Sequence, residues 1–137
     1  MPKALAEGDI IQYPYRWAGD AAEGRAPEGG KDRPSCLVLL IKDAAGRSVI
    51  FLAPISSKPP RGDQIALSIP ETERRRAGLE KYPEAWVFVD EVNTDMLGES
   101  WYMKPQNPMG TFGRAFLAKV AAAIRTNLRA RRAVNRR

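Results

Sequence analysis

Two apolar runs separated by a short turn constrain the fold of this chain most. Residues 35–42 (SCLVLLIK) are almost continuously apolar, and residues 48–56 (SVIFLAPIS) form the next apolar segment. Between them lies the stretch AAGR, in which Gly46 supplies the permissive backbone that a turn needs. We therefore predict two strands that pair as a hairpin.

Further short strands and turns surround this hairpin. Alternating or apolar patterns predict strands at 8–15, 64–69 and 85–92, and a last short one at 100–104. Residues 16–32 are rich in Gly, Ala, Pro and charge, and we expect a long loop there. Short strands with Pro and Gly turns predict a mainly β (α+β) chain, folded as a small barrel or strongly curled sheet.

Two helices complete the prediction. Residues 70–78 (PETERRRAG) begin with a proline, carry acids first and arginines last, and so match a short helix. Thr111 is a fair N-cap for a second, C-terminal helix. Apolar residues recur there at four-residue spacing, which predicts one amphipathic stripe packed on the sheet: Phe112, Phe116, Val120, Ile124 and Leu128.

The chain has 137 residues and 44% hydrophobic content, so we expect one domain over residues 1–128. No run of about 18 apolar residues is present, and the apolar stretch at the N-terminus is too short for a signal peptide. The single cysteine, Cys36, lies inside an apolar strand and predicts a small core residue in a reducing compartment. These features favour a cytoplasmic protein without a membrane span.

Positive charge is concentrated at the C-terminal end. The net charge is +6, but residues 129–137 (RARRAVNRR) hold five of the 22 basic residues and none of the 16 acidic ones, so the remainder is almost neutral. Two interpretations of this Arg-rich tail stay open. It contacts nucleic acid or an acidic partner, or it is a solvated helix end favoured by the helix dipole.

Histidine is absent from the sequence. This excludes a ribonuclease of the His–His type, a Ser-His-Asp hydrolase and a histidine-ligated metal site. One cysteine without histidine supplies no structural zinc set. No Gly-rich phosphate loop of the Walker or Rossmann type is present either. We therefore expect no metal and no cofactor.

Five motifs in order resemble the MazF/PemK/Kid family of type II toxin–antitoxin toxins. They are GDII near the N-terminus, then RPSCLVL, LAPISS, VDEVNTDML and the terminal FLAKVAAAI. The resemblance covers most of the chain, from Gly8 to about Leu128. It implies an SH3-like barrel with an appended C-terminal helix, usually a homodimer. It also implies metal-independent cleavage of single-stranded RNA and a cognate acidic antitoxin.

The resemblance also implies catalytic residues. Arg33 matches the arginine of the family's Arg-Pro motif, and its guanidinium suits bidentate binding of phosphate oxygens. Ser56 matches the hydroxyl residue that ends the Pro-Ile-Ser strand, where it can bond the scissile phosphate or the 2′-OH. Ser57 takes that role if the register slips by one. Each has a plainer alternative, a surface arginine at a strand start and a hydroxyl bonded to local backbone.

Four further residues are candidate substrate contacts. Asp90 opens the VDEVNTDML motif, where it either accepts a hydrogen bond from the substrate or organises the next turn. Trp17 either stacks on a base or packs in the core or a dimer contact. Lys58 suits a phosphate contact or solvent exposure, and Arg25 lies in the 16–32 loop, which commonly covers the RNA groove in this family.

Two residues depart from the family pattern, because Glu91 replaces a common glutamine and Asn93 a usual basic residue, and the loop before Arg33 is longer than is typical. Two other hypotheses therefore stay open. One is a non-catalytic module of the same fold that binds RNA or poisons a protein target, as the gyrase-poisoning branch does. The other is a small β-barrel with a structural or housekeeping role.

Overall fold

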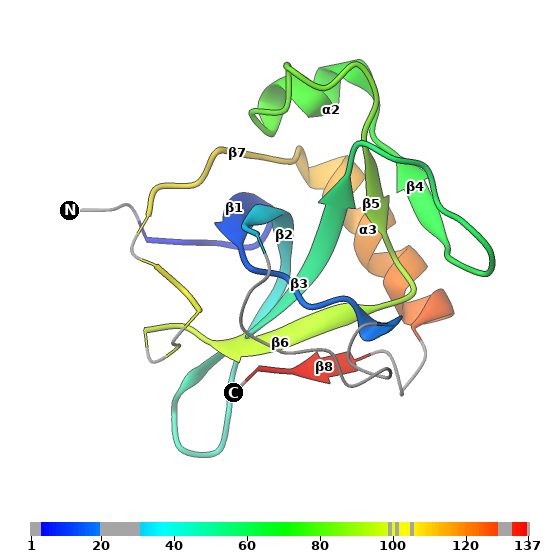
Figure 1. Cartoon of the computed structure of the whole chain (residues 1–137). Helices are drawn as coiled ribbons and strands as arrows, with labels where there is room; N and C mark the ends of the chain where they lie inside the picture. Colours follow the sequence, from blue (N-terminus) through cyan, green and yellow to red (C-terminus); the bar gives the residue numbers. More distant parts are fainter. Residues whose placement is uncertain are drawn as a thin grey trace.

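A computed structural model describes residues 4–19, 31–98, 100, 102–104, 106–128 and 133–136. Strands dominate the described chain, and Figure 1 shows them with their labels. In chain order the elements are β1 Asp9–Tyr13, β2 Arg33–Lys42, β3 Ser48–Ser56, β4 Ala66–Ser68, α2 Glu71–Arg76, β5 Trp86–Phe88, β6 Val92–Met96, β7 Gly110–Thr111, α3 Arg114–Asn127 and β8 Ala133–Asn135.

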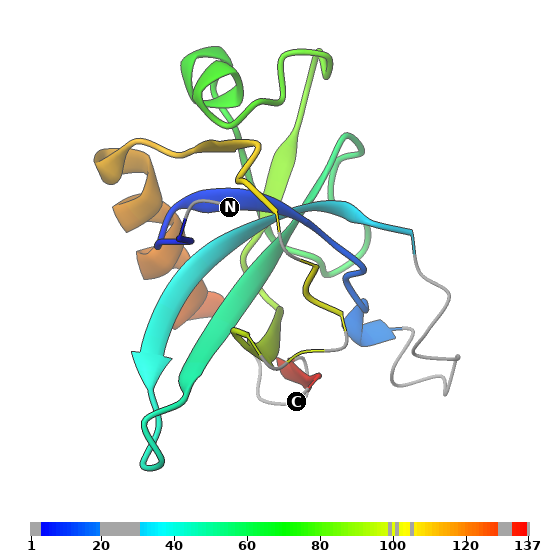
Figure 2. The ribbon, with the colours of Figure 1, turned by 90° about the vertical axis from the view of Figure 1, so that its left-hand side faces the viewer.

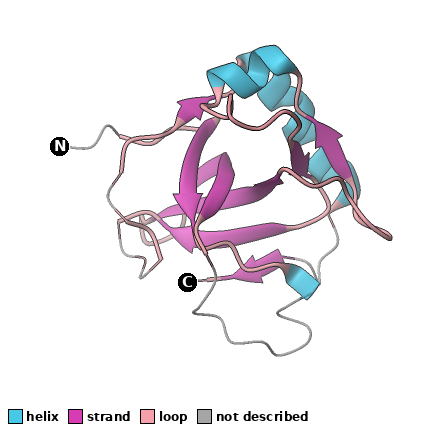
Figure 3. Ribbon diagram, turned by 45° about the horizontal axis from the view of Figure 1, so that its top comes forward, coloured by secondary structure: helices cyan, strands magenta, loops and turns pink. Residues whose placement is uncertain are grey.

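The strands form one mainly antiparallel sheet of eight. The predicted hairpin is its centre, with β2 and β3 paired from Ser35↔Pro54 to Lys42↔Ser48. β1 pairs with the other edge of β2 and with β7, while β5 and β6 share the other edge of β3. The prediction of a mainly β fold is confirmed, and Figure 3 shows the helices at the margin of a molecule built of strands and loops.

Both faces of the central hairpin are covered, which explains why β2 is apolar without alternation. Cys36 and Leu37 are adjacent, point to opposite faces and are both fully buried. Cys36 belongs to the core cluster that includes α3, and Leu37 to a second cluster with Tyr13 and Tyr15. Burial raises the pKa of the Cys36 thiol far above its ordinary value.

The turn end of the β2–β3 hairpin projects away from the rest of the ribbon (Figure 2). Its side chains Leu39 and Ile41 are 42% and 43% exposed. A register shift between Leu37 and Leu39 marks the point where the buried half of β2 ends.

The C-terminal helix uses the predicted stripe with two corrections. Phe116, Val120 and Ile124 are buried on α3, whereas Leu128 lies past the helix end and is 38% exposed. Thr111 is not the N-cap but part of β7, because its hydroxyl donates to Asp9 Oδ1 at 2.7 Å. The N-cap is Gly113, whose N–H donates to Glu73 Oε1 at 2.8 Å.

The short helix α2 also begins one residue later than predicted, with Pro70 as its N-cap. It is followed by Gly78, which has φ +74°. A Cβ at Gly78 would collide with the backbone of Met109, and one at Gly110 with the backbone of Arg76 and Ala77. These close approaches bring α2 against β7, so both positions require glycine.

The predicted strand at 85–92 is wrong as one element, because it is two strands with a break. The pairs Ile55↔Val87 and Leu52↔Asn93 are three residues apart on β3. On the partner side, from β5 to β6, they are six residues apart. The additional residues, 89–91, form an excursion that separates β5 from β6. The short strand predicted at 100–104 is also wrong, since its described residues 100 and 102–104 are not extended in a ladder.

The end of the Arg-rich tail is part of the sheet. β8 pairs in parallel with β6 through Val92↔Ala133, Asn93↔Val134 and Thr94↔Asn135. Arg136, directly after β8, is only 8% exposed. Residues 133–135 are therefore a strand and not a solvated helix end, whereas contact of the tail with nucleic acid or an acidic partner stays a prediction. In the part of the chain that the structure describes, no helix is long and apolar enough to cross a membrane.

Candidate functional site

Arg33 and Ser56 lie at the same end of the central hairpin. In the antiparallel register Ser35 lies opposite Pro54, so Arg33 and Ser56 each lie two residues further along their strands, on the same face. Both line a cleft of about 350 Å³, which we call the Arg33 cleft. The other lining residues are Lys31, Asp32, Pro34, Ile55, Ser57, Lys58 and Tyr82.

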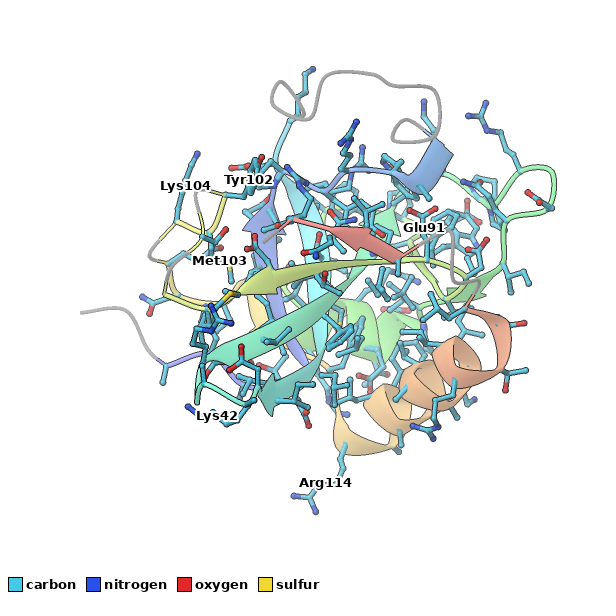
Figure 4. All side chains as sticks on the ribbon, turned by 90° about the horizontal axis from the view of Figure 1, so that it is seen from below. Lys42, Glu91, Tyr102, Met103, Lys104 and Arg114 are labelled. Atoms are coloured by element: carbon cyan, nitrogen blue, oxygen red, sulfur yellow. The ribbon has the colours of Figure 1, made fainter. Side chains whose placement is uncertain are left out.

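Three cationic side chains and three hydroxyl groups line this cleft beside the apolar Pro34 and Ile55. Lys31, Arg33 and Lys58 contribute three cations, and Asp32 is the single carboxylate among the lining residues. Asp32 Oδ2 lies 3.5 Å from Lys104 Nζ. The Lys104 side chain is 75% exposed and projects away from the molecule (Figure 4), so this ion pair lies in solvent. An exposed pair of this kind is weak, so it does little to fix Asp32. The arrangement suits a phosphate group with a nearby proton acceptor.

The Ser56 hydroxyl is also engaged locally. Its Oγ accepts a hydrogen bond from the backbone N–H of Lys58 at 3.1 Å, which turns the chain at the end of β3. The plainer alternative for Ser56 is therefore present in the structure. This bond uses an Oγ lone pair, so the O–H group keeps its capacity to donate to a phosphate oxygen.

Trp17 lies against Arg33, with the guanidinium Cζ 5.1 Å from the centroid of its ring. The described residues that line the Arg33 cleft do not include Trp17. Stacking of a base on this ring stays a prediction, while its packing role is evident. The rings of Tyr15 and Phe88 meet the Trp17 ring edge-on at centroid distances of 5.4 Å and 5.2 Å.

The remaining predicted residues divide three ways. Ser57 and Lys58 line the cleft beside Ser56. Asp90 does not line it, because it is fully buried in the excursion between β5 and β6. This burial argues against a direct contact of Asp90 with substrate, and its role in organising the next turn stays a prediction. Arg25 lies outside the described residues.

Glu91 and Asn93, which depart from the family pattern, bind the segment that carries Trp17. Glu91 Oε1 accepts hydrogen bonds from the Tyr15 hydroxyl at 3.1 Å and the Ala18 N–H at 3.0 Å. Asn93 Oδ1 accepts the Arg16 N–H at 2.8 Å, and its Nδ2 donates to the Arg16 carbonyl at 2.8 Å. Burial and the nearby Glu91 carboxylate raise the pKa of Tyr15 well above its ordinary value, so its hydroxyl stays a donor.

Asp95 and Arg136 extend this group of buried polar side chains. Asp95 Oδ2 accepts the hydroxyls of Tyr13 and Ser100, each at 2.5 Å. Arg136 donates from Nη1 to the Pro14 carbonyl at 2.9 Å and to Asn93 Oδ1 at 3.2 Å. Its guanidinium lies 3.8 Å from the centroid of the Tyr102 ring. We call Glu91, Asn93, Asp95 and Arg136 the β6 belt, and Figure 4 labels Glu91 and Tyr102.

Sequence reasoning missed Lys31, Asp32 and Tyr82 as cleft residues. Lys31 and Asp32 directly precede Arg33, so their position at the rim was visible in the KDRP stretch. Tyr82 comes from the connection between α2 and β5, and no local pattern indicated its approach to the hairpin. Among the described residues, no three His, Cys, Asp or Glu side chains are grouped so that they could hold a metal ion.

Neither the protein-family models nor the curated proteins compared with this chain match it. The fold and cleft define a mainly antiparallel β protein with a cationic, hydroxyl-bearing cleft at one end of its central hairpin. The resemblance to the MazF/PemK/Kid family stays a prediction, carried by the motifs in the sequence.

Proposed function

We propose that this chain is the toxin of a type II toxin–antitoxin system, with an SH3-like barrel and a metal-independent endoribonuclease site in the Arg33 cleft. The observation that carries the proposal is the convergence of Arg33 and Ser56, from two different strands, on one cleft with Lys31 and Lys58. The antiparallel hairpin brings the start of β2 and the end of β3 together, and at that end the sequence supplies an arginine, two lysines and two serines.

The chemistry uses the ribose of the substrate as nucleophile. The 2′-OH attacks the adjacent phosphorus, the bond from phosphorus to the 5′-oxygen breaks, and the products carry a 2′,3′-cyclic phosphate and a 5′-OH. Arg33 binds the non-bridging oxygens bidentately as charge accumulates on them, and Lys31 and Lys58 add positive potential. The Ser56 hydroxyl donates to the same phosphate and helps to orient it.

Proton transfer needs an acceptor other than histidine. Asp32 is the carboxylate among the lining residues, and we assign it the proton of the attacking 2′-OH. Its exposed pairing with Lys104 is easily exchanged for a contact with substrate. Water protonates the departing 5′-oxygen, which balances the proton that Asp32 takes.

The test is cleavage of single-stranded RNA by the purified chain in excess EDTA. We expect fragments with 2′,3′-cyclic phosphate and 5′-OH ends, identified by mass spectrometry, and no cleavage of the all-deoxy oligonucleotide. Arg33→Ala should lower the rate by about 10²- to 10³-fold, the usual cost of losing a donor that stabilises transition-state charge. Arg114→Ala is the matched control, because Arg114 projects into solvent from α3 (Figure 4). Unchanged cleavage by Arg33→Ala would remove this residue from the site.

A non-catalytic function in RNA binding or in targeting a protein is the second candidate. The burial of Asp90 favours it, because Asp32 is then the only one of the two carboxylates that lines the cleft. In its RNA-binding form this candidate predicts that the purified chain binds single-stranded RNA in EDTA without cleaving it. Growth arrest on expression with intact cellular RNA would select the protein-targeting form.

The partners follow from the same cleft. Three cations at its rim suit an acidic segment of a cognate antitoxin, which would compete with RNA for them. We also propose a homodimer in the cytoplasm, on the strength of the family resemblance. Copurification with the product of a neighbouring reading frame, released by high salt, is the direct test of the antitoxin.

A further inference from the structure

The contact with the Trp17 ring restricts the position of the Arg33 guanidinium. An arginine side chain has several rotatable bonds, and fixing it costs about 2 kcal/mol of conformational entropy. A ring face at 5.1 Å from Cζ restricts the guanidinium before any ligand binds. Because Arg33 lines the cleft and Trp17 does not, the ring supports the residue from outside the cleft.

The Trp17 ring is itself fixed by its neighbours. Phe88 on β5 is 2% exposed and meets the ring at an interplanar angle of 87°. Tyr15 meets it at 69° and is 4% exposed. Two buried aromatic residues in edge contact hold the ring in one orientation, since such pairs are directional.

The backbone around Trp17 is held as firmly. The single oxygen Glu91 Oε1 accepts from Tyr15 and from Ala18, one residue on the far side of Trp17. Asn93 forms two bonds to the backbone of Arg16, and is fully buried. The two departures from the family pattern thus serve to fix the segment that presents the ring.

We propose that Trp17 is a positioning residue that holds the Arg33 guanidinium in the orientation required for the scissile phosphate. Its effect on catalysis rests on the proposed function, whereas its effect on Arg33 does not. The ring acts through Arg33, so its removal lowers kcat and leaves the contacts of Lys31 and Lys58 with RNA in place.

The kinetic test compares Trp17→Leu with Trp17→Phe. The leucine variant removes the ring and should lower kcat by about 5- to 30-fold, which corresponds to a cation–π contact, with a smaller change in KM. The phenylalanine variant keeps a ring and should retain most of the activity. Tyr102→Leu is the matched control, because it removes the ring stacked on Arg136 and not on Arg33.

A second measurement does not require cleavage. In NMR spectra of the full chain, the side-chain resonances of Arg33 should carry a ring-current shift that is lost in Trp17→Leu and kept in Trp17→Phe. If the leucine variant does not fold, fluorinated tryptophan weakens the ring's attraction for the guanidinium without changing its shape. With Trp86 and Trp101 replaced by phenylalanine, only position 17 carries the label, and kcat should fall with added fluorine.

The outcomes are distinguishable. Absence of cleavage by the wild-type chain, with the Arg33 shift dependent on the Trp17 ring, overturns the proposed function and supports the positioning of Arg33. Arg33 resonances that are the same with and without the ring, in a folded protein, overturn the positioning role. Equal loss of kcat in Trp17→Leu and Trp17→Phe also overturns it, because a ring would then not be what matters.

Discussion

The Arg33 cleft and the β6 belt are both rich in charged side chains, yet the structure uses them in opposite ways. In the cleft, Lys31, Asp32 and Lys58 are exposed at the rim. In the belt, Glu91, Asn93 and Asp95 are 2%, 0% and 1% exposed and are bonded to hydroxyls, amides or a guanidinium. Polar residues that are fully satisfied inside the protein specify its structure, whereas those at a cationic rim are available to a ligand.

Substitution of one aspartate in each region, Asp32 in the cleft and Asp95 in the β6 belt, tests this comparison with the largest expected effects. Asp32→Asn should lower the rate of RNA cleavage by about 10²- to 10⁴-fold, because the amide cannot accept the proton of the 2′-OH. The melting temperature should stay within a degree or two of wild type, since the Asp32–Lys104 pair is exposed. Cleavage rates in EDTA and thermal melts measure the two effects. A rate near wild type would show that Asp32 does not accept the proton of the 2′-OH.

Asp95→Ala should have the reverse effect. It leaves the Tyr13 and Ser100 hydroxyls and the Met96 N–H without their acceptor inside the protein. We expect a loss of about 3 kcal/mol in the free energy of unfolding, from orphaned buried donors. Urea denaturation measures it, and cleavage by the fraction that remains folded should be unchanged. A loss of activity without a loss of stability would mean that the belt belongs to the site.

Arg136→Ala tests whether the end of the tail is structural. The guanidinium bonds Pro14 and Asn93 and stacks on Tyr102, so we expect a loss of about 1–3 kcal/mol. RNA affinity and its salt dependence should not change, because this charge is buried and does not contact phosphate. Arg114→Ala, an exposed arginine on α3, should change neither quantity. Weaker RNA binding by a fully stable Arg136→Ala protein would restore the nucleic-acid interpretation of the tail.

The last expected effect is a gradual decline in stability at alkaline pH, which is small just above pH 10.0 and grows with pH. The pKa values of Tyr13 and Tyr15 are raised above the ordinary 10.0, by burial first and by Asp95 and Glu91 next. Above pH 10.0 the unfolded chain releases these protons while the folded chain keeps them, so stability is full below that pH and falls as pH rises. The slope should approach about 1.4 kcal/mol per pH unit for each tyrosine. Tyr15→Phe should remove its share of the slope in urea titrations at several pH values.

Periodicity predicted the parts of this fold that depend on local pattern. The hairpin and the α3 stripe were visible because apolar residues at strand or helix spacing select a face. The break between β5 and β6 was not, because VFVDEV is apolar enough for one strand and its register is set by β3. β8 was missed for a similar reason, since Ala133–Asn135 is short, lies among arginines and is stabilised by a distant strand.

The site divides in the same way. Arg33, Ser56 and Ser57 were predicted from motifs and Lys58 from its charge in the loop that follows them, and all four line the same cleft. Asp90 shows the limit of such reasoning, because a motif gives a residue type and not its burial. The support that Glu91 and Asn93 give to the Trp17 segment depends on contacts between residues more than 70 positions apart, as in the bond from Ala18 to Glu91.

The reactivity of the Cys36 thiol can report how often the central hairpin of this chain opens. It is the single cysteine, it is fully buried at the centre of the hairpin, and its thiol is held protonated by its surroundings. A thiol reagent should therefore modify the chain only when the central strands separate. The rate of labelling then reports how often the hairpin opens, in wild type and in every variant described above, without a fluorophore or an added mutation.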